Sequence, residues 1–129
     1  MGAFDMLNIA SSSLGMHQTW LDALANNIAN INTATRTSQS AFQGQMVIAG
    51  ARATGGVDVA GLAYTDKTGR VVNDPTNALA DAQGNIRLPD IDLASEMSQL
   101  VMAQRGFQAS VQVTKTAQDS YSAALQIGK

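Results

Sequence analysis

Apolar residues recur every seven positions near the N-terminus of this chain. They form two rows offset by three residues: Leu7, Leu14, Leu21 and Ile28, then Ala10, His17, Leu24 and Ile31. Two such rows are typical of a helix that packs along its length against another helix. The pattern predicts a helix from about residue 3 to residue 31, ending where asparagines become frequent.

A second pair of rows follows near the C-terminus: Leu93, Leu100, Phe107, Thr114 and Tyr121, then Met97, Gln104, Val111, Gln118 and Leu125. This pattern predicts a second helix that begins at Asp90–Asp92 and ends at Ile127. Each helix would be roughly 40 to 50 Å long, which is more than a small globule can bury. We expect an assembly seam made of Leu7, Leu14, Leu21, Leu24, Ile28, Ile31, Leu93, Met97, Leu100, Phe107, Val111, Tyr121 and Leu125.

The middle of the chain has few large apolar residues and most of the glycines. Short alternating stretches predict strands around residues 46–48 and 57–60, and a hairpin between 62–64 and 70–72 with a tight turn at 65–69. The predicted fold is mainly α with a small β-rich insert. The terminal helices would pair as an antiparallel coiled-coil hairpin. The segments 1–33, 34–89 and 90–129 would form one domain.

Composition argues against several classes of function. The net charge is −2 and the eight basic residues are scattered, so nucleic acid and anionic membranes are poor partners. There is no cysteine, which excludes disulfides and thiolate sites. The chain shows neither a cleavable secretory signal nor the roughly 18 consecutive apolar residues of a membrane span. We therefore expect a structural protein rather than an enzyme.

Three features could suggest chemistry, and each has a simpler explanation. His17, the only histidine, has no catalytic or metal-spaced partner and is expected to be packed or hydrogen-bonded. Asp90 and Asp92 could form a carboxylate pair, but capping the second helix explains both. The segment 81–85 resembles a calcium loop but lacks its alternating acids and closing glutamate, which favours a turn. No cofactor and no metal are expected.

Polar residues at the helix ends are harder to dismiss. Asn26, Asn27, Asn30 and Asn32 lie within seven residues, which suggests side-chain amides that bind backbone or neighbouring chains. Glu96, the sole glutamate, could complement the helix dipole or form a salt bridge to an arginine of a neighbouring subunit.

Two motifs resemble the bacterial flagellar axial proteins, the rod and hook subunits. Residues 25–33 read Ala-Asn-Asn-Ile-Ala-Asn-Ile-Asn-Thr, similar to the motif that ends the first helix in that family. Residues 91–97 read Ile-Asp-Leu-Ala-Ser-Glu-Met, and residues 104–110 read Gln-Arg-Gly-Phe-Gln-Ala-Ser. The signature positions are Asn26, Asn27, Asn30, Asn32, Asp92, Glu96 and Arg105. The segments 56–61, 74–75 and 79–89 resemble a proximal rod subunit in particular.

The resemblance implies a structural subunit of the proximal rod, assembling helically into a drive shaft that transmits torque across the periplasm. It implies export through the flagellar type III apparatus without a cleaved signal. The implied partners are other copies, rod proteins of the FlgB, FlgF and FlgG type, FliE, the export apparatus and the surrounding ring proteins. The alternatives are another rod subunit such as FlgB and a free-standing helical interaction or secreted protein. A small hydrolase is a distant third, since no nucleophile–base pair is visible.

Overall fold

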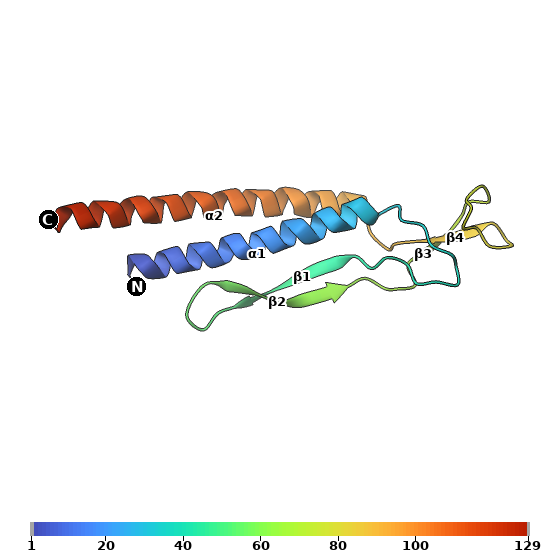
Figure 1. The fold of residues 1–129 in the computed structure, drawn as a ribbon, viewed down its shortest axis with the longest axis horizontal. Helices are drawn as coiled ribbons and strands as arrows, with labels where there is room; N and C mark the ends of the chain where they lie inside the picture. The colour runs from blue at the N-terminus through green and yellow to red at the C-terminus, as the bar shows by residue number, and fades with distance from the viewer. Residues whose placement is uncertain (1, 129) are drawn as a thin grey trace.

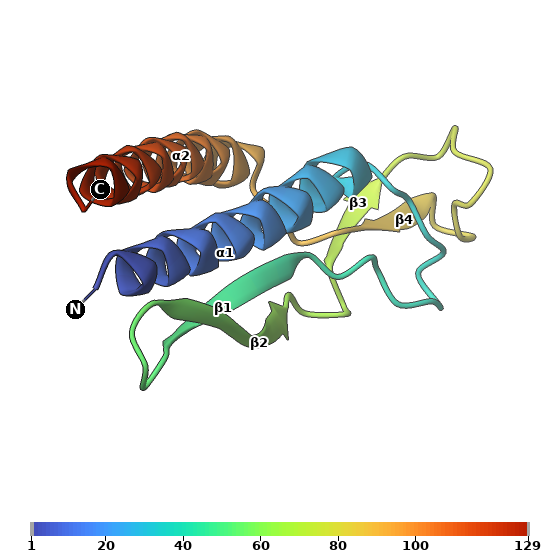
Figure 2. The ribbon, with the colours of Figure 1, turned by 60° about the vertical axis from the view of Figure 1, so that its left-hand side comes forward.

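Two long helices flank a small β-rich insert in the computed structural model, which describes residues 2–128 (Figure 1). The elements are α1 (Ala3–Asn30), β1 (Gln45–Ala51), β2 (Val57–Tyr64), β3 (Arg70–Asn73), β4 (Asn85–Leu88) and α2 (Leu93–Ile127). The two helices lie side by side, and the β1–β2 ribbon contacts α1 (Figure 2). The predicted arrangement of a helix at each end and a β-rich insert between them is confirmed.

The helices run in opposite directions, as three pairs of contacts show. The rings of Phe4 and Tyr121 meet edge to face with centroids 5.0 Å apart. The hydroxyls of Ser13 and Ser110 are 2.7 Å apart. The Asn27 amide donates to Glu96 at 3.0 Å. Residues later in α1 thus contact residues earlier in α2, which is the order expected of antiparallel helices.

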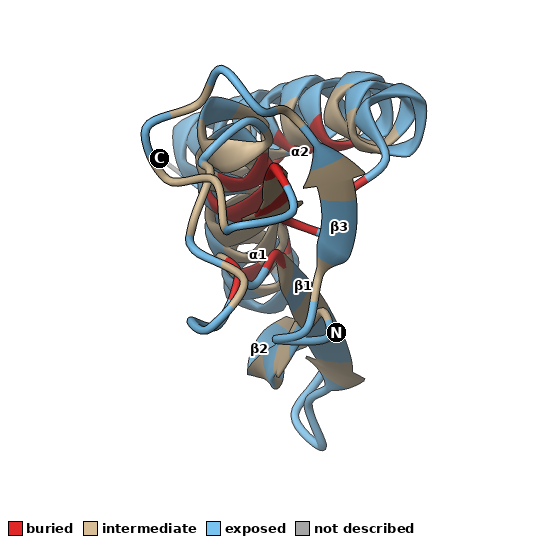
Figure 3. Cartoon of the chain, turned by 90° about the vertical axis from the view of Figure 1, so that its right-hand side faces the viewer, coloured by how far each residue is buried: buried red, intermediate tan, exposed pale blue. Residues whose placement is uncertain are grey.

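The α2 residues that face α1 are mostly small. Ala103, Ser110 and Ala117 are buried and spaced by seven. Half-buried residues form the neighbouring row: Leu100, Phe107, Thr114 and Tyr121. Small side chains in one row let the two backbones approach closely, and the larger row then closes the seam. Buried residues gather where α1 meets α2 and the ribbon, while much of α2 is exposed (Figure 3).

The second predicted row of α2 lies outside the buried contact with α1, and its part in an assembly seam stays a prediction. Met97, Gln104, Val111, Gln118 and Leu125 are all exposed, and so is Leu93 of the first row. The physical reason is that close packing of the helices selected the small residues one position earlier in the repeat. On α1 the prediction fits better, because Ala10 and Leu24 are buried. The remaining α1 positions are half-buried: Leu7, Leu14, His17, Leu21, Ile28 and, just past the helix, Ile31.

The start of α2 is capped by Asp92. Its carboxylate accepts hydrogen bonds from the backbone N–H groups of Ala94 and Ser95, each at 3.3 Å. This satisfies donors that have no partner in the first turn of a helix. Capping by Asp92 is thus confirmed, whereas Asp90 lies before the cap and is exposed.

The strands form two separate two-stranded antiparallel sheets, β1–β2 and β3–β4. The predicted hairpin between residues 62–64 and 70–72 is wrong. Residues 57–60 and 62–64 belong to the single strand β2, which pairs with β1 from Gln45↔Tyr64 to Ala51↔Val57. β3 pairs instead with β4, beginning at Arg70↔Leu88.

The tight turn at residues 65–69 does form, but it joins the two sheets. The backbone N–H of Gly69 donates to Asp66 O at 3.1 Å, and Gly69 has a φ of 54°. A Cβ at Gly69 would lie 2.2 Å from the carbonyl oxygen of Leu88 and 2.6 Å from Cβ of Ala41. Gly69 therefore lies directly beside Leu88 of β4, and the strand that follows the turn, β3, pairs with β4. Within residues 2–128, no helix combines the length and apolar character that a membrane crossing requires.

Candidate assembly surfaces

The two helices approach each other closely at His17 and Gly106. A Cβ on Gly106 would fall 2.1 Å from Nε2 of His17. The His17 ring is held by Nδ1, 2.8 Å from the carbonyl oxygen of Ser13. The histidine is therefore packed and hydrogen-bonded in the helix seam, as expected from the sequence.

The two serine hydroxyls of the seam, Ser13 and Ser110, are paired within the chain. Beside the contact between the Ser13 and Ser110 hydroxyls, Ser110 Oγ donates to the carbonyl oxygen of Gly106 at 2.9 Å. Satisfied hydroxyls of this kind carry little desolvation cost when apolar groups cover them. Apolar side chains can therefore cover these hydroxyls without leaving a hydrogen-bonding group unpaired.

Asn27 joins three elements at the other end of the helix pair. Its side chain is fully buried, and Nδ2 donates to Gln45 O at 2.9 Å and to Glu96 Oε2 at 3.0 Å. Its Oδ1 accepts from Gln45 N at 2.7 Å. Both amide donors and the acceptor are used inside the chain, so of the two expected kinds of partner, backbone and neighbouring chains, Asn27 uses the backbone.

The other signature residues occupy different environments. Asn30 Nδ2 donates to the carbonyl oxygen of Asn26 at 2.9 Å, and Asn30 Oδ1 accepts from Thr33 Oγ1 at 3.1 Å, which closes the end of α1. Asn32 and Arg105 are exposed. Glu96 contacts Asn27 within the chain, and a bridge from Glu96 to a neighbouring arginine stays a prediction.

The segment 81–85 is a turn built on the carboxylate of Asp81. Its oxygens accept from the backbone N–H groups of Gln83 and Asn85 and from Thr37 Oγ1, each at 2.9 Å. The hydrogen bond from Asn85 is the main cause that lowers the pKa of Asp81 below its usual range. The turn prediction is confirmed, because the ionised carboxylate is committed to these donors.

Other charged groups of the insert serve local structure. Arg52 and Asp58 form an exposed ion pair near the tip of the β1–β2 ribbon, and the hydrogen bond from Arg52 lowers the pKa of Asp58. Arg87 donates to the carbonyl oxygens of Thr37 and Thr68. Across residues 2–128, no three His, Cys, Asp or Glu side chains gather closely enough to hold a metal ion.

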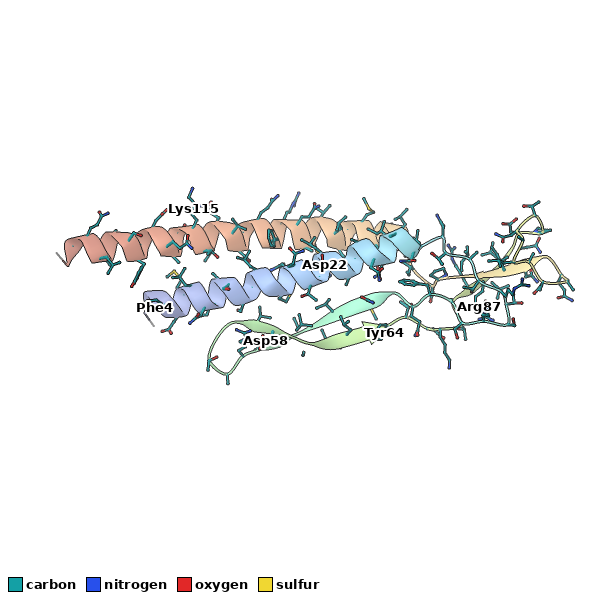
Figure 4. All side chains as sticks on the ribbon, in the orientation of Figure 1. Phe4, Asp22, Asp58, Tyr64, Arg87 and Lys115 are labelled. Carbon is teal, nitrogen blue, oxygen red and sulfur yellow. The ribbon has the colours of Figure 1, made fainter. Side chains whose placement is uncertain are left out.

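Apolar side chains remain exposed on two sides of α2. We call Leu93, Met97 and Val101 the outer strip; they are 48, 47 and 44% exposed. The end groove is a hollow of about 660 Å³ between the helices, lined by Gly2, Met6, Ile9, Ala10, Ser13, Ala109, Ser110 and Val113. Side chains project along α2 on the side away from α1, as Lys115 does in Figure 4. Both surfaces are mainly apolar and are left uncovered by residues 2–128.

Comparison with known proteins gives a consistent result. Residues 82–127 match the family described as "Flagellar basal body rod FlgEFG protein C-terminal". The chain is 30% identical to the flagellar basal-body rod protein FlgC of Salmonella typhimurium and 31% identical to that of Escherichia coli O157:H7, each over 134 residues. It is 30% identical over 152 residues to FlgC of Bacillus subtilis. In all three comparisons the similarity covers the full length of both chains.

Proposed function

The chain belongs to the FlgC family of flagellar basal-body rod proteins and is a structural rod subunit, and we propose that it builds the proximal part of the rod. There it would assemble helically into the drive shaft that transmits torque across the periplasm. Membership of this family sets aside the alternatives of a FlgB-type subunit, a free-standing helical protein and a hydrolase.

The observation that best supports assembly is the exposed apolar surface of α2. A 35-residue helix packs on one face against α1 and carries large apolar side chains on faces that nothing in the described chain covers. Exposed apolar patches on a soluble chain mark surfaces for other macromolecules. Long helices also depend on packing for most of their stability.

The helix pair and the insert would have different roles within one domain. Residues 1–33 and 90–129 would form the axial unit, an antiparallel coiled-coil hairpin, and residues 34–89 would project from it. The α1 positions of the seam would hold the pair together: Leu7, Leu14, Leu21, Leu24, Ile28 and Ile31, with Leu100, Phe107 and Tyr121 from α2. The exposed positions Leu93, Met97, Val111 and Leu125 would then face neighbouring subunits.

The proposed partners follow from family membership. They are other copies of this chain, rod proteins of the FlgB, FlgF and FlgG type, FliE, the flagellar type III export apparatus and the ring proteins around the rod. Export would proceed without a cleaved signal. A disassembled subunit that passes through a narrow channel would then gain its remaining contacts at the growing rod.

Deleting the gene and imaging isolated basal bodies tests this function. We expect truncated basal bodies without a complete rod, and loss of swimming that the native gene restores. Restoration with the Lys67→Ala variant should also succeed, because Lys67 is exposed in the turn that joins the two sheets. Complete rods in the deletion strain would contradict the proposal.

A further inference from the structure

We propose that one buried water molecule binds between Thr35 and Arg87, where the β-rich insert joins the helix pair. The inference goes beyond the proposed function, because it concerns how the insert is held in place within one chain. Two buried polar atoms carry it: within residues 2–128, Thr35 Oγ1 and Arg87 Nε have no hydrogen-bond partner. Native proteins rarely leave buried polar groups unpaired, so both atoms require a partner.

The site lies where the chain enters and leaves the insert. Thr35 is five positions after Asn30, the last residue of α1, and Arg87 is six positions before Leu93, the first residue of α2. Thr35 and Arg87 form an isolated antiparallel bridge, and each backbone N–H donates to the other residue's carbonyl oxygen at 2.9 Å. Residues paired in this way carry their side chains on the same face, with Cβ atoms about 5 Å apart.

The guanidinium of Arg87 is held with one donor left over. Its Nη1 donates to the carbonyl oxygen of Thr68, and its Nη2 donates to the carbonyl oxygen of Thr37. In the planar guanidinium, the Nε–H lies on the same edge as one N–H of Nη2. Because Nη2 reaches Thr37, this edge faces the segment 35–37, and the remaining Nε–H points toward the side on which Thr35 lies.

A water molecule satisfies both unpaired atoms at once. Thr35 Oγ1 and Arg87 Nε make no direct hydrogen bond, although their side chains share a face. Water accepts from the Nε–H and bonds to the threonine hydroxyl either as donor or as acceptor. A buried water makes about three hydrogen bonds, and the carbonyl oxygen of Thr37 supplies the third through its second lone pair.

A chloride ion is the main rival occupant, since the hydroxyl and the Nε–H are both able to donate to an anion. The position of Asp66 argues against it. The pKa of Asp66 is lowered mainly by the hydrogen bond from the backbone N–H of Thr68, and the positive charges of Lys67 and Arg87 lower it further. The carboxylate of Asp66 therefore lies within the electrostatic reach of Arg87 and would repel an anion there, whereas a water molecule is neutral.

The bound water would tie the segment that follows α1 to the strand that leads to α2. Figure 4 places Arg87 within the insert, where several segments of the chain cross, and away from most of the helix pair. Loss of the water should accordingly loosen the attachment of the insert and leave the contact between α1 and α2 intact.

Oxygen-17 relaxation dispersion of water counts the long-lived water molecules bound to the full chain in solution. Thr35→Val keeps the shape of the side chain and removes the hydroxyl, so we expect this variant to lose about one long-lived water relative to the native chain. Two matched controls should keep the native number. Thr35→Ser retains a hydroxyl, and Thr33→Val removes an exposed hydroxyl at the end of α1.

Equal numbers of long-lived waters in the native chain and in Thr35→Val would overturn the inference. So would a saturable shift of the Arg87 Nε–H resonance with sodium chloride but not with sodium sulfate, because it would identify chloride as the occupant. If Thr35→Val fails to fold, a high-resolution crystal structure of the native chain decides the question. A water within about 3.2 Å of both atoms supports the inference, and an empty position there overturns it.

Discussion

His17 occupies the space that a side chain at Gly106 would need. The imidazole Nε2 lies 2.1 Å from the position of a Cβ on Gly106, and the ring is fixed by its contact with the carbonyl oxygen of Ser13. The glycine therefore serves close helix packing at this point, although glycine weakens a helix interior by about 1 kcal/mol relative to alanine.

Gly106→Ala should lower the free energy of unfolding by about 1–3 kcal/mol, because the added methyl forces the ring or the backbone to move. Urea denaturation of the purified chain measures this. In a His17→Ala background the same substitution should be neutral or stabilising, since the obstacle is gone and alanine favours the helix. Equal losses in both backgrounds would show that His17 is not the cause.

Asn27→Leu should destabilise the chain itself and not only its assembly. It leaves the backbone groups of Gln45 and the carboxylate of Glu96 without their partner, at a cost of about 1–3 kcal/mol for each unpaired group. Denaturation and hydrogen exchange at β1 report the change. Asn32→Ala is the matched control, because Asn32 is exposed and its removal should stay within about 0.5 kcal/mol.

Leu24→Ala should cost about 2–5 kcal/mol of stability, since Leu24 is only 2% exposed in the helix seam. Leu125→Ala removes the same atoms from an exposed position and should leave the unfolding of the isolated chain nearly unchanged. Similar urea midpoints for the two variants would show that Leu24 does not belong to the core of the helix pair.

The turn around Asp81 should depend on pH. The pKa of Asp81 is lowered in the folded chain, so the carboxylate stabilises the turn above the unfolded pKa of about 4. This contribution disappears as pH falls through the lower folded value. In an NMR titration, the Gln83 and Asn85 amides should respond at a lower pH than in a peptide covering residues 79–86. Asp81→Asn should abolish that response, and a midpoint equal to that of the peptide would contradict the role of these hydrogen bonds.

The seven-residue repeat was sufficient to predict both helices, but not which α2 row faces α1. The seven-residue spacing placed Met97 and Val111 in the expected seam, whereas the structure buries Ala103 and Ser110. That choice depends on how closely the two backbones approach, and the small residues Ala103, Gly106 and Ser110 permit this approach only once α1 is in place.

The insert shows the same limit of local patterns. The turn at residues 65–69 was predictable from composition, yet the strands on either side of it pair with other partners, β1 and β4. The asparagine cluster likewise indicated buried amides without revealing their partners. Those of Asn27 lie 18 and 69 positions away in the chain.

The antiparallel pairing of the terminal helices has a consequence for the order of folding. Ser13 and Ser110 are 97 positions apart, and Phe4 meets Tyr121 close to the other terminus. Contacts between such distant positions require closure of a long loop before they form, which slows folding. A chain that emerges N-terminus first from a ribosome or a narrow pore therefore holds α1 without its partner until nearly the whole sequence has emerged, and α2 completes the structure only at the end.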